Sequence, residues 1–143
     1  MYKYLLIIVI TGWCSSACKK EKNDMQSLLT SKQWKKAHVD TNPSSIPQFL
    51  TVGYVPVASC EEDNTYKFNS NGKLQVNSGS KHCDDKEAKN ESLNYTVDFT
   101  NKKLVINGVS YTIIEITSTQ LKYYLDVPSY TGYQGGPIYL YSH

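Results

Sequence analysis

The fold is decided by residues 103–125, which read KLVINGVSYTIIEITSTQLKYYL. Apolar and polar residues alternate along most of this stretch, and alternation with a period of two places apolar side chains on one face of a β-strand. Asn107-Gly108 favours a tight hairpin turn, and the polar run at 117–120 favours a second turn. The stretch therefore predicts three consecutive antiparallel strands over residues 103–106, 109–117 and 121–127.

The alternation changes phase inside the second predicted strand. Ile113 continues the face of Tyr111, whereas Ile114 and Ile116 have the phase of Tyr123 across the turn. One extra residue in the strand brings the two faces together, so we predict a β-bulge near Ile113 and Ile114. Bulges of this kind help a sheet to curl toward closure.

An earlier hairpin is predicted for residues 65–77. A three-residue loop with Gly72 in the left-handed conformation places Phe68 opposite Leu74, so that two apolar side chains meet. A two-residue loop would place Phe68 opposite Gln75 instead. The apolar match selects the longer loop.

Two cysteines approach each other if this hairpin register continues outward. Counting back along one strand and forward along the other brings Cys60 to within one residue of Cys83. We predict a disulfide between them, and the length of the closed loop makes it worth about 3 kcal/mol of stability. Disulfides persist in oxidising compartments, so the pair predicts a protein exported from the cytoplasm.

Other parts of the chain continue the same strand pattern. Turn signals recur roughly every 8–12 residues, which is typical of an up-and-down barrel, and residues 25–32 are helix-like or irregular. The remaining predicted strands are 33–40, 65–68, 73–77, 93–99 and 138–141. The sequence therefore predicts an all-β domain over residues 33–143, an antiparallel up-and-down meander or barrel of about eight strands that follows an N-terminal signal helix.

The N-terminal residues have the order of a secretory signal. Lys3 precedes an apolar core at residues 4–10, and the small or turn-prone Thr11 and Gly12 follow it. This core is too short to span a bilayer as a helix. We therefore predict a signal peptide over residues 1–17.

The tetrapeptide SSAC at residues 15–18 resembles the lipobox of bacterial lipoproteins. The resemblance implies cleavage before Cys18 and acylation of this cysteine with chains such as palmitate, which bind the membrane at about 0.8 kcal/mol per buried methylene. Residues 18–32 then form the lipid anchor and tether, and Lys19 favours the outer membrane of the bacterial envelope, on its periplasmic or its outer side. A metal or redox pair of Cys14 and Cys18 is the alternative, but no second pair of cysteines has matching spacing.

Composition narrows the class of partner. The 143 residues suffice for one domain, the net charge is +2, and every basic residue other than histidine is lysine. Without arginine, the chain has no planar fork that binds phosphate or guanine edges through two hydrogen bonds. The sequence therefore argues against a nucleic-acid partner.

The domain resembles the lipocalin-like domains of small secreted bacterial lipoproteins. The resemblance rests on Trp34 in the first strand, on CEEDNTYKFNSNGKLQVNSG at 60–79 with the later Cys83, and on residues 103–125. It implies an up-and-down barrel that either holds a small apolar molecule or is filled by its own side chains.

Aromatic side chains that share one face of the predicted strands are the candidates for lining a ligand site, because such sites are mostly apolar. They are Trp34, Tyr66, Phe68, Tyr95, Phe99, Tyr111 and Tyr123. We expect a non-catalytic protein that binds a small, apolar molecule and is attached to the membrane through its lipid anchor. The alternative is a filled barrel whose loops contact another envelope protein.

Two loops offer further candidate surfaces. Residues 41–59 contain three prolines and join the first strand to the hairpin, and in a lipocalin-like barrel this connection arches over the open end. Its apolar residues there either cap a ligand or plug the core; they are Phe49, Leu50, Val52 and Tyr54. In the loop 129–137, Tyr130 and Tyr133 form either an adaptable contact surface or ordinary exposed positions.

Titratable residues suggest no catalytic or metal centre. His38, on the same predicted strand face as Trp34, lacks an identifiable partner, and Glu115 is expected to be exposed on the outer face at the bulge. Oxygen ligands that could take calcium surround the predicted disulfide, but solvated loops explain them better because no ordered spacing is present. These are Glu61, Glu62, Asp63, Asp84, Asp85 and Glu87, with His82 among them. We therefore expect no catalytic residues, no metal and no cofactor.

Overall fold

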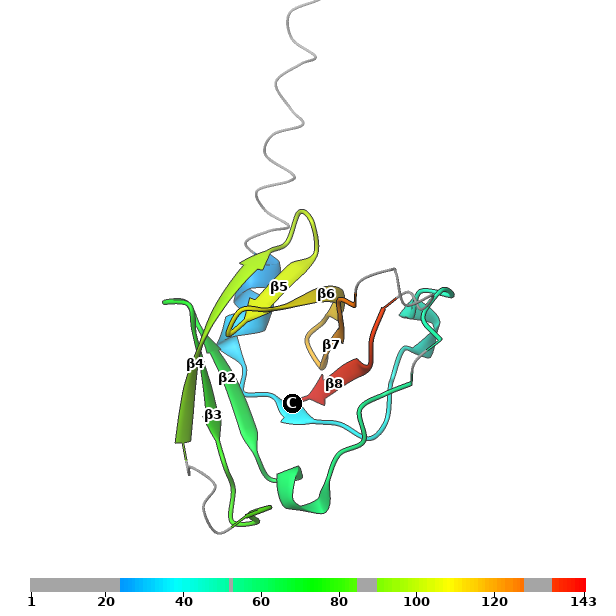
Figure 1. Cartoon of the computed structure of the whole chain (residues 1–143). Helices are drawn as coiled ribbons and strands as arrows, with labels where there is room; N and C mark the ends of the chain where they lie inside the picture. Colours follow the sequence, from blue (N-terminus) through cyan, green and yellow to red (C-terminus); the bar gives the residue numbers. More distant parts are fainter. Residues whose placement is uncertain (1–23, 52, 85–89, 128–134) are drawn as a thin grey trace, which may run out of the picture.

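The computed structural model describes residues 24–51, 53–84, 90–127 and 135–143. In these residues, eight antiparallel strands form one sheet in the order β1-β8-β7-β6-β5-β4-β3-β2 (Figure 1). The strands are β1 (Lys35–Lys36), β2 (Thr65–Asn69), β3 (Lys73–Asn77), β4 (Asn90–Asp98), β5 (Lys103–Ile106), β6 (Val109–Ile116), β7 (Gln120–Leu125) and β8 (Ile138–Ser142). The predicted all-β meander is confirmed.

The sheet curls until its two edges almost meet. Next to β1, the backbones of Trp34 and Tyr66 exchange two hydrogen bonds of 2.8 Å, which join this edge of the sheet to β2. Closure of this kind removes the unpaired strand edges that would otherwise invite aggregation. The domain is therefore a nearly closed barrel.

A short helix at residues 24–31 lies at one end of the barrel. Its Leu29 is fully buried, and its carbonyl oxygen accepts a 3.1 Å hydrogen bond from the indole N–H of Trp34. Thr30 borders the same surface depression as the β2–β3 turn at 70–72, so the helix lies at the end where that turn lies. We call it the closed end. The connections β1–β2, β3–β4, β5–β6 and β7–β8 lie at the opposite, open end because successive antiparallel strands reverse direction.

The β2–β3 hairpin has the predicted register. Phe68 lies opposite Leu74, and Gly72 adopts the left-handed conformation with a φ of 77°. The three-residue loop is confirmed, and with it the rule that the apolar match selects the turn.

The bulge in β6 is confirmed, but one pairing differs. The register between β6 and β7 shifts between Ile113 and Glu115, so Ile113 rather than Ile114 lies opposite Tyr123. Ile114 is the extra residue, and its insertion lets Ile113 keep the inward face of Tyr111. The expected match between Ile114 and Tyr123 was therefore wrong by one residue.

The first strand is much shorter than predicted. Regular pairing ends at Lys36, and only the amide of Ala37 continues it, with a 2.9 Å hydrogen bond to Leu140. The chain then leaves the sheet, and residues 53–55 return to the other half of β8, where Tyr54 forms a parallel bridge with Ile138. Two separate segments thus share the edge of β8, which a single continuous strand at 33–40 would have occupied.

The core lies inside the barrel. Its buried members are Leu29, Trp34, Phe68, Leu74, Tyr95, Leu104, Ile106, Ile113, Leu121, Tyr123 and Tyr141. Phe68 and Tyr95 meet edge to face with ring centroids 5.0 Å apart, and the Tyr95 hydroxyl donates a 2.8 Å hydrogen bond to the carbonyl of Asn69. Aromatic pairs of this geometry add about 0.5–1.5 kcal/mol beyond their burial.

The predicted disulfide is present at the open end. Cys60 and Cys83 are bonded, with their Cα atoms 5.1 Å apart. Cys60 belongs to the short 3₁₀ turn η2 (Ser59–Glu61), so the bond ties the segment before β2 to the segment after β3. A bond of this kind is typical of proteins outside the cytoplasm.

Candidate functional site

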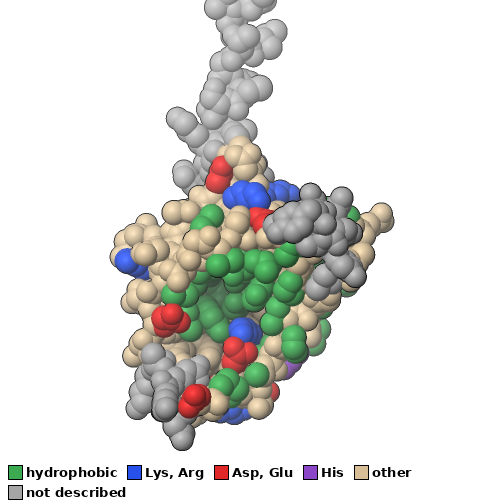
Figure 2. Space-filling view, viewed as in Figure 1, with side chains coloured by type: hydrophobic (Ala, Val, Ile, Leu, Met, Phe, Trp, Pro, Cys, Tyr) green, Lys and Arg blue, Asp and Glu red, His purple; other side chains and the backbone are tan. Residues whose placement is uncertain are grey.

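Inward-facing side chains stay accessible to solvent in part of the barrel. Tyr139 lies opposite Tyr123 across the β7–β8 ladder, so both rings point into the barrel. Tyr123 is only 3% exposed, whereas Tyr139, Tyr66 and Tyr111 are partly exposed and pack against the core. Figure 2 shows a hollow on this face, with hydrophobic side chains across its floor. Side chains therefore fill the core of the barrel, and next to this core the interior is open to solvent.

Five tyrosines on the inner face of the barrel pack ring against ring, and we call them the tyrosine wall: Tyr66, Tyr111, Tyr123, Tyr139 and Tyr141. Tyr123 stacks on Tyr139 and Tyr141 with centroids 5.3 and 5.6 Å away, and Tyr111 meets Tyr123 edge-on at 5.1 Å. Tyr66 meets Tyr141 edge-on at 5.0 Å. The wall offers ring faces and ring edges to a bound molecule.

The phenols of the tyrosine wall are hydrogen-bonding groups at neutral pH. Burial raises the pKa of Tyr123 well above its ordinary value, and the 3.0 Å hydrogen bond that its hydroxyl donates to Tyr141 contributes. Burial also raises the pKa of Tyr111. Both groups therefore stay protonated, and a phenol can donate and accept a hydrogen bond.

Lys36 faces the same interior. It lies opposite the core residue Tyr141 in the β1–β8 pair and two residues after the inward-facing Trp34, so its side chain starts on the inner face. The side chain is 14% exposed, and its Nζ lies 2.5 Å from the Oε1 of Glu61, whose side chain is 28% exposed. A charged pair therefore joins β1 to the turn η2 at the open end.

The residues expected to line a ligand site separate into two groups. Trp34, Phe68, Tyr95 and Tyr123 are buried in the core, whereas Tyr66, Phe99 and Tyr111 are partly exposed around it. Sequence reasoning missed Tyr139, Tyr141 and Lys36. The alternation in β8 and the position of Lys36, two residues after Trp34, were the signals that could have found them.

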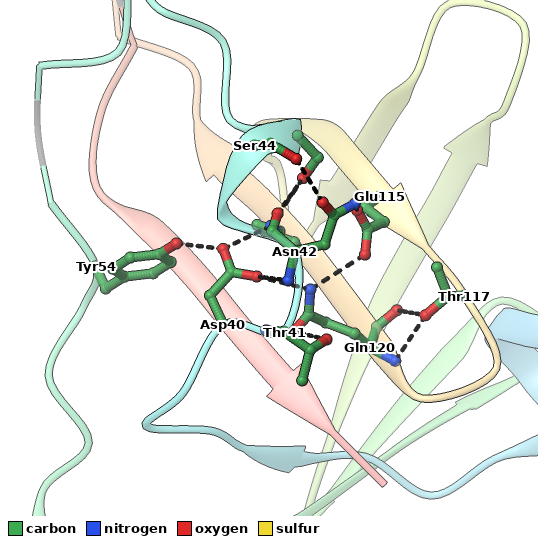
Figure 3. A network of polar contacts seen from close by, with 10 residues as sticks. Asp40, Thr41, Asn42, Ser44, Tyr54, Glu115, Thr117 and Gln120 are labelled. Atoms are coloured by element: carbon green, nitrogen blue, oxygen red, sulfur yellow. Dashed lines mark hydrogen bonds and ion pairs between the residues drawn. The ribbon is translucent and has the colours of Figure 1, made fainter.

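A polar network covers the outer face of β7, outside the barrel (Figure 3). Lys122 points outward between two inward-facing residues, yet it is fully buried because residues 40–45 lie over it. Its Nζ donates hydrogen bonds to Asp40 Oδ2 at 2.6 Å, to the carbonyl of Asn42 at 2.8 Å and to Ser45 Oγ at 2.8 Å. These bonds use all three ammonium protons.

Asp40 is the anionic centre of this network. Burial acts to raise the pKa of its carboxyl group, but hydrogen bonds from Lys122 and then from Tyr54 outweigh burial and lower the pKa to about 2. Gln120 completes the network: its amide donates to Asp40 at 2.9 Å and to Glu115 at 3.1 Å. The closed set of donors and acceptors indicates a structural role.

The network decides where the connection 41–59 lies. Tyr54 donates to Asp40, and the ring of Phe49 meets Tyr124, which points outward next to the inward-facing Tyr123. Phe49 and Tyr54 therefore neither cap the hollow nor plug the core. The buried ion pair of Lys122 and Asp40 holds the connection against the outer face. Val52 lies outside the described residues.

Two other expected positions, those of His38 and Glu115, are corrected or refined. His38 does not share the inner face of Trp34, since the strand has ended there and its side chain is 61% exposed, 3.9 Å from Glu62. Glu115 is on the outer face at the bulge, but it is partly buried and accepts a 2.6 Å hydrogen bond from Asn42.

The acidic residues near the disulfide have protein partners of their own. Glu61 pairs with Lys36, Glu62 lies 2.5 Å from the Nζ of Lys81, and Asp63 accepts a 2.6 Å hydrogen bond from the amide of Ser80. In the described part of the chain, no group of three or more His, Cys, Asp or Glu side chains is placed to hold a metal ion. The expected surface residues Tyr130 and Tyr133, and the acids Asp85 and Glu87, lie outside that part.

A second depression lies on the outer surface at the closed end, with a volume of about 470 Å³. Only polar residues line it: Thr30, Asn69, Ser70, Asn71, Lys73, Gln75 and Ser92. A site without apolar lining suits an apolar molecule poorly, since such ligands bind by leaving water. The hollow beside the tyrosine wall is therefore the better candidate.

Comparison with known proteins identifies the kind of domain. A family model described as a lipocalin-like domain matches residues 31–123. The match begins just before Trp34 and ends within β7, so it spans most of the barrel. Neither a curated protein nor a solved structure matches the chain. Among the described residues, no helix is long and apolar enough to cross a membrane.

Proposed function

The chain belongs to the lipocalin-like domain family, and on this premise we propose that it is a non-catalytic binding protein whose barrel holds a small, mostly apolar molecule. Lipocalin-like domains are generally binding proteins without catalytic activity. The observation that carries the proposal is the tyrosine wall, because three of its rings face the interior and still contact solvent.

Covering these rings with a ligand would be favourable. Each Å² of apolar surface removed from water contributes about 25 cal/mol, and ligand pockets commonly bury most of the surface of a small molecule. The wall is also held in place by its own ring contacts and by the core below it. A site that needs little reorganisation loses little binding energy to ordering.

We further propose that the domain is lipid-anchored at Cys18 on the outer membrane. The motif at 15–18 and the disulfide between Cys60 and Cys83 support export. Residues 19–23 span at most about 18 Å when extended, and the helix that follows lies at the closed end. The closed end would therefore face the membrane, and the hollow would face away from it.

Native mass spectrometry of the whole protein, extracted gently from membranes in detergent, tests the binding proposal. We expect a reproducible mass excess from a bound small molecule. Val76→Trp should remove it, because Val76 is partly buried on the inner face opposite Tyr66. Gln75→Trp is the matched control, since Gln75 is exposed on the outer face.

The outcomes separate the alternatives. A wild-type protein that stays bare after incubation with envelope extracts would contradict the proposal and favour a filled barrel that acts through its loops. Loss of the bound mass in Gln75→Trp but not in Val76→Trp would place the ligand in the polar depression outside the barrel.

A further inference from the structure

The charged pair of Lys36 and Glu61 at the open end restricts the class of ligand more than the tyrosine wall does. Lys36 is a lysine at an inward-facing position of a barrel, where an apolar residue would cost nothing to bury. Removing an ammonium group from water is costly unless an anion compensates it. Keeping a lysine at this position therefore calls for an anionic partner.

Glu61 is the partner in this structure, and it is a replaceable one. The disulfide at Cys60 holds the backbone of its turn η2, but the side chain of Glu61 is twice as exposed as that of Lys36, so the side chain alone can turn toward water. Lys36, by contrast, is fixed in the sheet through its pairing with Tyr141. If the two separate, Glu61 can return to water, whereas Lys36 stays at the edge of the hollow.

The ammonium group of Lys36 has capacity left for a ligand. Within the described residues its partner is Glu61, which uses one of its three protons. A narrow gap beside it is bordered by Val55, Tyr139 and Tyr141, so two members of the tyrosine wall lie next to the charge. Glu61 shows that a carboxylate fits against this ammonium group at 2.5 Å.

We propose that the ligand is an anionic amphiphile, with a carboxylate or similar head group that replaces Glu61 at Lys36 and an apolar body that lies against the tyrosine wall. This inference rests on the proposed binding function. The exchange keeps the charge at the open end balanced, because one carboxylate leaves as another enters. A neutral head group gains no ionic contact with Lys36, and a cationic head group is repelled by the ammonium group of this partly exposed lysine.

A competition between amphiphiles that differ only in the head group tests the inference. The whole protein in detergent is incubated with an equimolar mixture of dodecanoate, dodecanol and dodecylamine, and the bound masses are resolved by native mass spectrometry. We expect dodecanoate to exceed each of the other two by about tenfold, the size of effect that one charge-assisted hydrogen bond supplies.

Three variants assign this preference to the charged pair. Lys36→Met should bring dodecanoate and dodecanol to equal occupancy, whereas Lys35→Met should leave the preference intact, since Lys35 is exposed on the outer face. Glu61→Gln should increase the preference for dodecanoate, because it removes the internal competitor. Circular dichroism checks that each variant is folded. If Lys36→Met does not fold, Glu61→Gln still tests the inference.

The results distinguish this inference from the function on which it rests. Equal binding of dodecanoate and dodecanol by the wild type, a preference that survives in folded Lys36→Met, or a preference for dodecylamine would overturn the inference and leave the binding function standing. Binding of none of the three, together with the absence of any native ligand, would overturn both.

Discussion

Lys122 and Asp40 illustrate how a buried ion pair can be tolerated on the outside of a barrel. Each ion loses several kcal/mol of hydration on burial, and only good geometry with further hydrogen bonds compensates this loss. Lys122 has three acceptors, and Asp40 accepts from Lys122, Tyr54, Gln120 and the amide of Asn42. The pair therefore holds the long connection after β1 in one place.

The depressed pKa of Asp40 predicts an acid-sensitive contribution to stability. Its carboxyl has a pKa of about 2 in the folded protein, against an ordinary value of 3.8. The contribution is fully present above the ordinary value, and it is lost as the pH falls toward the folded one. Its size is about 2 kcal/mol.

Urea unfolding of the wild type and of Asp40→Asn, at about pH 6 and about pH 2, measures this contribution. Asp40→Asn leaves Lys122 buried without an anion, so we expect it to be about 3–5 kcal/mol less stable at the higher pH. The difference in the free energy of unfolding between the two proteins should narrow by about 2 kcal/mol at the lower pH. A gap that does not depend on pH would show that Asp40 is not the titrating group.

At the scale of the secondary-structure elements, the turns set the register of the strands. Gly72 has a φ of 77°, and a Cβ atom there would lie 3.2 Å from the carbonyl oxygen of Tyr95 in β4. Gly108 has a φ of 84°, but a Cβ atom at this position would meet nothing within 4 Å. The two glycines share the backbone requirement and differ in their surroundings.

Replacing each glycine by alanine separates these two effects. Gly108→Ala should lower the free energy of unfolding by about 1–2 kcal/mol, the cost of a left-handed alanine. Gly72→Ala should cost more, since it adds a close contact to the backbone of the neighbouring strand. Thermal unfolding of both variants checks which one loses more stability. An equal loss would mean that β4 moves away from the added methyl group at no cost in free energy.

Local pattern was enough to predict most elements, and the failures are long-range. The turn with Gly72 and the bulge at Ile114 follow from alternation within a few residues of each. The early end of β1 does not, because it depends on Asp40 reaching Lys122, 82 residues later in the chain. The burial of Lys122 is a second example, because it depends on residues 40–45, which no local pattern connects to β7.

At the scale of the whole molecule, the barrel has two ends with different chemistry. The closed end has the helix at 24–31 and the buried indole of Trp34, and the open end has the disulfide, the charged pair and the hollow. Predicting the hollow from sequence was beyond reach, because the same tyrosines could fill an interior or line it. Which they do depends on how strands distant in sequence meet.

The lipid anchor is the prediction that belongs to this scale. Cys18→Ala removes the thiol that would carry the acyl chains, so we expect the variant to leave the membrane fraction. Cell fractionation followed by immunoblotting measures the change, and Cys14→Ala is the matched control that should stay bound. Unchanged membrane association of Cys18→Ala would contradict the lipoprotein assignment.

The position of Trp34 has an optical consequence. The chain has two tryptophans, Trp13 and Trp34, and removal of the leader would leave Trp34 alone. Its indole is fully buried and hydrogen-bonded to Leu29, so its emission should be shifted to the blue. The tyrosine wall shares the same small barrel and would pass excitation energy to this indole. A molecule that enters the hollow and absorbs in the near ultraviolet would intercept that transfer, so the barrel would report its own occupancy as a change in fluorescence.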